Sequence, residues 1–154
     1  MATPYSLPQP TPPTSSITPI EDSLLVSMVS TLKDVLNAAY PDFTVVKTIR
    51  TYDAYLVPLT EFPLLKLYRT SDSFRNVGKA TSSLTCSYCL ANADLERMPG
   101  LTRWTGEKIV GGIYQFGVDN KLHRLQGDIS VQYRTLAQMG ELIYQTDCSF
   151  QLEA

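Results

Sequence analysis

One segment of the chain, residues 19–40, has an apolar face that only a second layer of structure can cover. Its polar positions carry serines and charged side chains, and its apolar side chains recur every three or four residues. Thr18, Pro19 and Glu21 have the form of a capping box with proline at the first helical position, and Pro41 limits the other end. The sequence therefore predicts a helix over residues 19–40 that covers a β-sheet with Leu24, Leu25, Met28, Val29, Leu32, Val35, Leu36 and Ala39.

Alternation of apolar and polar side chains predicts the strands of that sheet. A central strand with one face on a helix is expected in residues 61–73, where Pro63 opens the run and a polar cluster closes it. Leu65 and Leu67 should point to one face of this strand, and Leu64, Lys66 and Tyr68 to the other. Residues 51–61 and 73–82 are expected to be an irregular connection and a loop. A glycine at position 140 indicates a hairpin between the last two strands. The other strands are expected at residues 43–50, 83–91, 129–135 and 142–152.

Between these strands, residues 92–116 have an interrupted helical pattern. We expect a short helical turn up to Met98, a break at Pro99-Gly100, and a second helix over residues 102–115 that Gly111-Gly112 weakens. The predicted fold class is α+β. An antiparallel or mixed sheet carries one long N-terminal helix and a shorter second helix, and a proline-rich arm extends from the N-terminus.

The arm, residues 1–18, differs in composition from the single domain expected over residues 19–154. Six of the ten prolines lie in the first twenty residues, which favours extended polyproline II. A disordered tail is one interpretation. The other is an arm that lies across a neighbouring copy, because Tyr5, Leu7 and Ile17 offer apolar anchors and proline lowers the entropy lost on docking.

The overall charge argues against several classes of function. Charged residues make up 18% of the chain, below the usual quarter, which fits burial against other subunits. The net charge of −2 gives no basic field for nucleic-acid binding. No apolar run has the length of a membrane span, and no secretory signal is evident. We expect a protein made in a cytoplasm, with its three cysteines reduced.

Few residues in the sequence are candidates for a metal site or a catalytic site. Cys86, Cys89, Cys148 and the single histidine, His123, are the possible zinc ligands. Cys86 and Cys89 lie three positions apart on a predicted strand, so their side chains should point to opposite faces, and buried thiols are the favoured interpretation. No nucleophile, phosphate-loop or metalloprotease motif is present. We therefore expect no enzymatic activity, no metal and no cofactor.

The order of elements, together with the segment Phe62-Pro63-Leu64-Leu65-Lys66-Leu67-Tyr68, resembles the tail terminator family of long-tailed bacteriophages, the minor tail protein U-like proteins. The resemblance covers most of residues 19–152. Members of this family are small α/β proteins with helices packed on a β-sheet. The N-terminal arm and the Pro99-Gly100 interruption depart from the family pattern.

The resemblance implies a virion structural protein of the tail and neck, assembled in the host bacterial cytoplasm. Its copies would form a ring, commonly of six, that caps the tail tube and joins it to the neck or connector protein. The sheath is a further possible partner, DNA would only pass through the lumen, and no membrane is involved. Alternatives are another head–tail connector or head-completion protein, or a small zinc- or thiol-binding protein. The expected oligomer interface includes Tyr5, Leu7, Ile17, Arg69 and Arg75. From their spacing alone, Arg69, Arg75 and Lys79 indicate either a local positive patch or, more commonly, a solvated loop.

Overall fold

A computed structural model describes residues 22–39, 45–54, 57–76, 79–91, 98–120, 124–138 and 140–153. These residues form two α-helices, a short 3₁₀ turn and one mixed five-stranded sheet, so the predicted α+β class is confirmed. The elements in chain order are α1 (Ser23–Ala39), β1 (Thr48–Arg50), η1 (Leu59–Glu61), β2 (Leu64–Asn76), β3 (Lys79–Ala91), α2 (Met98–Asp119), β4 (Arg124–Gln138) and β5 (Glu141–Glu153).

The sheet has the strand order β1-β2-β3-β5-β4. β1 runs parallel to β2, and all the other neighbouring pairs are antiparallel. The strand after Pro63 is therefore paired on both sides, as an internal strand should be, but β3 holds the middle position. The expected hairpin of the last two strands is confirmed, and Gly140, with φ +78°, lies in its turn.

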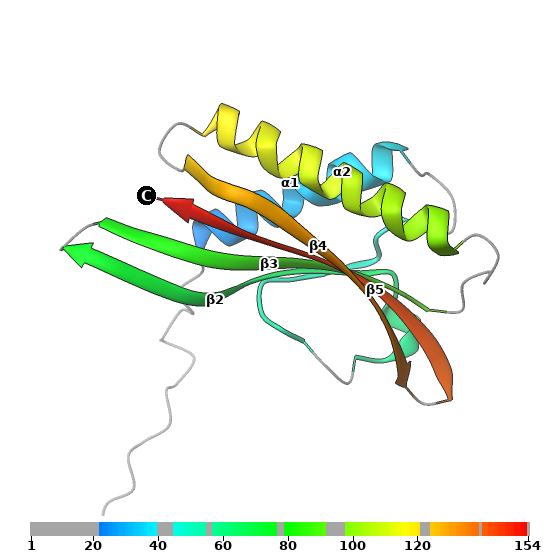
Figure 1. Cartoon of the computed structure of the whole chain (residues 1–154). Coiled ribbons are helices and arrows are strands. Elements are labelled where there is room, and N and C mark those ends of the chain that lie inside the picture. Colours follow the sequence, from blue (N-terminus) through cyan, green and yellow to red (C-terminus); the bar gives the residue numbers. More distant parts are fainter. Residues whose placement is uncertain are drawn as a thin grey trace, which may run out of the picture.

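Both helices lie on the same face of the sheet (Figure 1). The main core lies between these layers and takes alternate side chains from each of the inner strands. Leu65 and Leu67 of β2 share this face, and the alternation of β3 places its apolar side chains there as well. The face contributed by β3 and β5 consists of Leu84, Cys86, Tyr88, Leu90, Cys148, Phe150 and Leu152.

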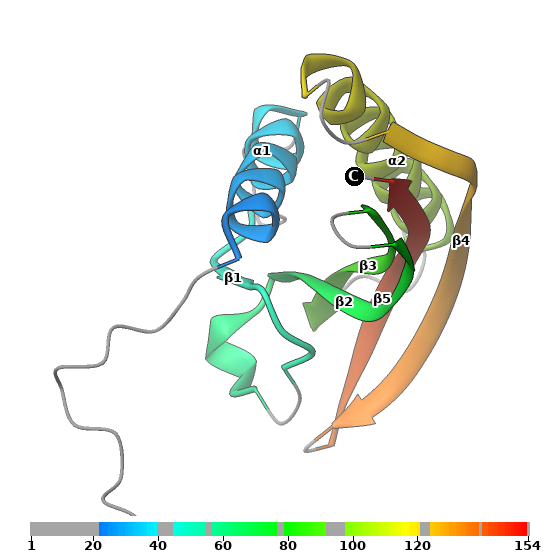
Figure 2. The same cartoon turned by 90° about the vertical axis from the view of Figure 1, so that its left-hand side faces the viewer.

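The other face of the sheet is covered only in part. The connection between β1 and β2 passes beneath this face (Figure 2), and its described residues are 51–54 and 57–63. A second, smaller apolar cluster forms there from Ala54, Val57, Phe62, Leu64, Cys89 and Ile143. The irregular connection expected over residues 51–61 thus has a packing role on the face away from the helices.

The prediction of a loop over residues 73–82 is wrong. β2 continues to Asn76 and β3 begins at Lys79, so the polar cluster at residues 70–73 lies within a long antiparallel hairpin. Residues 70–75 are exposed, because this end of the hairpin extends beyond the core. A strand exposed on both faces needs no alternation of apolar and polar side chains, and its backbone hydrogen bonds are supplied by the partner strand.

The prediction of a shorter, interrupted second helix is also wrong. α2 has 22 residues against 17 in α1, and it begins at Met98, so Pro99 and Gly100 lie in its first turn. Proline is tolerated there because the first amides of a helix have no intrahelical partner. The strand expected over residues 43–50 is described from residue 45 on, and within 45–50 it is found only at Thr48–Arg50. The predicted capping box falls outside the described residues, and Asp22 accepts a bond from the Leu25 amide at 3.4 Å.

The two adjacent glycines of α2 have different surroundings. A Cβ at Gly112 would lie 2.6 Å from Leu32 Cδ2, so the missing side chain is what lets α1 and α2 approach closely. A Cβ at Gly111 would meet nothing within 4 Å.

We therefore expect opposite effects from two matched substitutions. Gly111→Ala should stabilise the protein by up to about 1 kcal/mol through helix propensity. Gly112→Ala should destabilise it, because overpacking a core costs about 1–3 kcal/mol and outweighs that gain. Urea unfolding of both variants and the parent protein measures the difference. Equal midpoints for the two variants would contradict the close helix contact.

Candidate assembly interface

The structure describes two of the five residues expected at an oligomer interface. Arg69 lies in β2 where this strand passes the start of α1, and Arg75 is exposed near the end of the β2–β3 hairpin. Tyr5, Leu7 and Ile17 lie outside the described residues.

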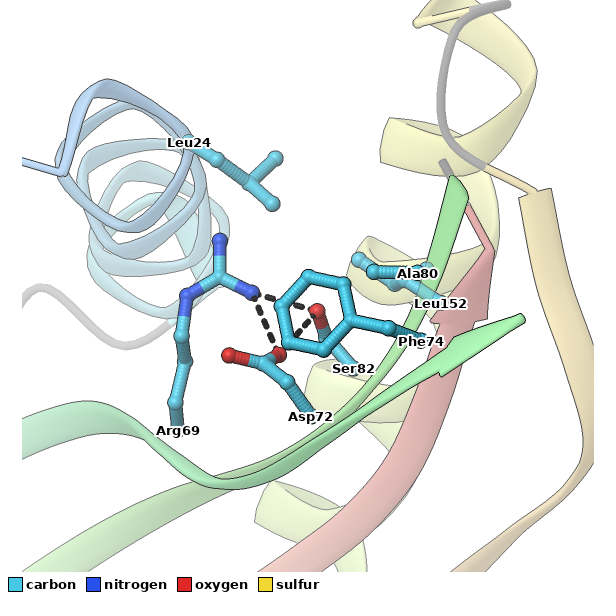
Figure 3. Close-up of a pocket in the computed structure, with 7 residues that line it drawn as sticks. All are labelled: Leu24, Arg69, Asp72, Phe74, Ala80, Ser82 and Leu152. Atoms are coloured by element: carbon cyan, nitrogen blue, oxygen red, sulfur yellow. Dashed lines mark hydrogen bonds and ion pairs between the residues drawn. The ribbon is translucent and has the colours of Figure 1, made fainter. Parts of the chain in front are cut away.

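Arg69 belongs to a network of paired groups. Its Nε lies 2.7 Å from Asp22 Oδ2, and its Nη1 lies 3.3 Å from Asp72 Oδ1. The same Nη1 donates to Ser82 Oγ at 2.5 Å, and Ser82 donates to Asp72 Oδ1 at 2.6 Å, as Figure 3 shows. The Asp22 carboxylate raises the pKa of Arg69, and Arg69 in turn lowers the pKa of Asp22. Two carboxylates thus neutralise this guanidinium, and the positive patch expected of Arg69 and Arg75 is not formed by Arg69.

A surface pocket of about 260 Å³ opens beside this network, between the start of α1 and the β2–β3 hairpin (Figure 3). We call it the Phe74 pocket. Phe74 is the most exposed large hydrophobic side chain among the described residues, with 72% of its surface accessible. The lining residues of the Phe74 pocket are Leu24, Arg69, Asp72, Phe74, Ala80, Ser82 and Leu152.

The β4–β5 hairpin is the second place where apolar side chains reach the surface. Residues 132–137 of β4 are all exposed, as the hairpin extends beyond the helices. Tyr133, Leu136 and Leu142 expose about half of their surface each. β4 is also the last strand of the sheet, and no strand in the described part of the chain pairs with its outer edge. An unpaired edge of this length is a template for pairing with another chain.

A buried polar network lies on the sheet face away from the helices. The Asp147 side chain is only 4% exposed. Its Oδ1 accepts from Ser87 Oγ at 2.6 Å and from Gln145 Nε2 at 2.7 Å, while its Oδ2 accepts from Arg134 Nε at 2.7 Å. These bonds join β3, β5 and β4, so the network fixes the position of the hairpin.

A lysine extends this network toward the connection between β1 and β2. Lys66 Nζ donates to Asp53 Oδ1 at 2.7 Å and to the Ala54 carbonyl at 3.0 Å. Burial raises the pKa of the neighbouring Tyr68 phenol. Because each of these charged groups has a partner within the fold, we regard the network as structural rather than as a binding site.

The three cysteines do not come together as a ligand set. Cys86 and Cys148 are cross-strand neighbours in the main core, whereas Cys89 lies on the opposite face, so the divergence predicted for Cys86 and Cys89 is confirmed. Among the described residues, no three histidine, cysteine, aspartate or glutamate side chains are placed to hold a metal ion. His123 lies outside those residues.

Thiol reactivity follows from the burial of these cysteines. Burial raises the pKa of Cys89 and of Cys148 to about 12 and that of Cys86 well above its ordinary value. Thiolate is the reactive form, so its population at pH 8 is far smaller than for an exposed cysteine. We expect an aromatic disulfide reagent to modify none of the three thiols in the native protein within minutes and all three in denaturant. Rapid native labelling would contradict their burial.

None of the described helices is long and apolar enough to cross a membrane. Comparison of the chain with models of known protein families gives no match, and comparison with curated proteins gives no significant match. The features that sequence reasoning missed are Phe74, which lay in an expected loop, and the Asp147 network. The latter joins residues that are 60 positions apart at Ser87 and Asp147, so no local pattern marks it.

Proposed function

We propose that the protein is a virion structural protein, a phage tail terminator whose copies form a ring at the end of the tail tube. The observation that carries the proposal is the surface of the two hairpins. The β4 edge and the exposed side chains of Phe74, Tyr133, Leu136 and Leu142 offer an extended apolar and hydrogen-bonding surface suited to other chains. The helix-on-sheet architecture agrees with the fold implied by the resemblance to that family.

A ring is the assembly that such a surface favours. In a ring, adjacent copies are related by a rotation and meet through two different patches, so the contact is heterologous. The ring is closed when successive rotations add up to a full turn. The two hairpins lie at different ends of the sheet, which provides two patches on each copy. A function of this kind is geometric and needs no nucleophile, metal or cofactor. The charged groups of the Asp147 and Arg69 networks, which are paired within the fold, are compatible with that role.

The proposal is tested by the mass of the purified protein and by its affinity for tail tubes. Mass photometry is expected to show a closed ring, with six copies as the resemblance implies, and electron microscopy to show it at one end of purified tubes. A strict monomer at high concentration without affinity for tubes would overturn the proposal. Binding to the connector but not to the tube would instead identify a head-completion protein, and stoichiometric zinc in elemental analysis would favour the zinc-binding alternative.

Two surface variants of similar exposure test which face forms the ring. Leu136 in β4 and Val26 in α1 are 43% and 37% exposed. Both Leu136→Glu and Val26→Glu should leave the free energy of unfolding within about 0.5 kcal/mol of the parent value. Only Leu136→Glu is expected to reduce ring yield, because only it places a charge on the hairpin. Equal yields for the two variants would remove the β4–β5 hairpin from the proposed interface.

A further inference from the structure

The Phe74 pocket has the composition of a receptor for an uncharged, apolar segment. Leu24, Phe74, Ala80 and Leu152 make up four of its seven lining residues. Leu152 is buried in the main core and Leu24 packs against that core, so this apolar wall is rigid. Phe74 lies beside Ala80, its cross-strand partner, with 72% of its surface exposed (Figure 3). An aromatic ring beside aliphatic side chains is a surface on which extended proline-rich segments dock.

The polar side of the pocket disfavours an anionic ligand. Its one cation, Arg69, is paired with Asp22 and Asp72, and Ser82 bridges the Arg69 guanidinium to the Asp72 carboxylate. A phosphate or a carboxylate would have to displace one of these carboxylates from the guanidinium and would be repelled by the other. The apolar side chains that make up most of the lining favour an uncharged, apolar occupant.

The chain itself contains a segment with these properties. Residues 1–17 include five prolines and no charged side chain, and they carry Tyr5 and Leu7 as large apolar groups. The chain outside the described residues joins the fold at Asp22, whose carboxylate contacts Arg69 at the rim of the pocket. Every copy therefore holds the receptor and the start of the segment at the same corner of the molecule.

We propose that the Phe74 pocket of one copy receives the Tyr5–Leu7 part of the N-terminal segment from a neighbouring copy. Leu7 precedes Asp22 by fifteen positions, which corresponds to about 45 Å of polyproline II at roughly 3.1 Å per residue. Because a proline-rich composition favours polyproline II, folding back to the pocket beside Asp22 would cost free energy, and we assign the segment to the pocket of an adjacent subunit. The inference that the segment comes from a neighbouring copy rests on the proposed function, whereas the inference that this segment binds this pocket does not.

Binding of the segment is measured without any ring. The receptor is the full chain carrying Tyr5→Ser and Leu7→Ser, which leaves its own segment without anchors. A fluorescent peptide of residues 1–17 is expected to bind it saturably by anisotropy. Adding Phe74→Ser should weaken binding about tenfold or more, because the aromatic wall is lost. Adding Tyr133→Ser, which removes another exposed aromatic far from the pocket in sequence and strand, should change nothing. No binding, or equal binding by the two receptors, would overturn the proposal.

The source of the segment is tested by cross-linking between copies. Copies with Leu7→Cys are mixed with tagged copies carrying Ala80→Cys and oxidised with copper phenanthroline; the native cysteines are all buried. A covalent heterodimer is expected, and replacing Ala80→Cys by Val118→Cys at the exposed end of α2 should abolish it. In a preparation of one chain that carries both substitutions, cross-links within single copies and no cross-links between copies would overturn the exchange between copies. A ring that forms while the peptide fails to bind would leave the proposed function standing and reject this inference alone.

Discussion

Phe150→Asp is expected to prevent cooperative folding. Phe150 is 3% exposed in the main core and pairs across the sheet with Leu84 of β3. An aspartate there loses the packing of the aromatic ring and places a carboxylate where no described cation lies in the core cluster. The two losses together cost several kcal/mol, against a total stability of about 5–15 kcal/mol for a domain.

The measurement is urea unfolding followed by far-ultraviolet circular dichroism. Phe150→Asp should show either no transition or a midpoint reduced by more than half. Leu142→Asp is the matched control, because it makes a similar change in the same strand at a side chain that is 47% exposed. It should unfold within about 0.5 kcal/mol of the parent protein. A soluble Phe150→Asp variant with the parent midpoint would show that the register of β5 is wrong.

Asp147→Ala is expected to destabilise the protein by about 3 kcal/mol. Removing this buried carboxylate leaves the Ser87 hydroxyl and the Gln145 amide without their acceptor and the Arg134 guanidinium without its counter-charge. Breaking a buried pair from one side is costly, because the remaining groups have been desolvated and have nothing to bond. Arg134 is half exposed and can turn to water, which keeps the expected loss below that of a fully buried pair.

Thermal and urea unfolding of Asp147→Ala are compared with Asp128→Ala, which removes an exposed acid from β4 and should change stability by less than about 0.5 kcal/mol. Combining Asp147→Ala with Arg134→Ala should cost less than the sum of the single changes, since the two residues share one interaction. Additive losses would show that Arg134 contributes nothing through Asp147.

The elements that sequence reasoning placed correctly are those with one apolar face in the main core. Residues 83–91 alternate because β3 has apolar side chains under the helices and smaller or polar ones on the other face. The segment 19–40 has a helical period because one face of α1 is buried against α2 and the sheet, and the described part of that helix is Ser23–Ala39. In both cases the apolar side chains recur with the period of the secondary structure, so their period in the sequence predicts the type of element.

The elements that sequence reasoning missed are those without such a face. In the outer part of the β2–β3 hairpin, residues 70–75 of β2 are all exposed, so this part of the strand resembles a polar loop. Pro99 and Gly100 indicate a break when the sequence is considered alone, because both residues disrupt the interior of a helix. At the start of a helix neither residue disrupts it. The Asp147 network and the Phe74 pocket depend on strand order, which brings together residues from β2, β3, β4 and β5 and leaves no trace in local sequence.

The place of β5 between β3 and β4 has a consequence for biosynthesis. A ribosome releases the amino-terminal part first, so β4 emerges while its sole described neighbour, Glu141–Glu153, is still unmade. Until then β4, a strand of fifteen residues, lacks the strand that joins it to β3 in the sheet. A message cut short before codon 141 would therefore yield a polypeptide that cannot close its sheet, and such a product should be degraded before it can join other copies.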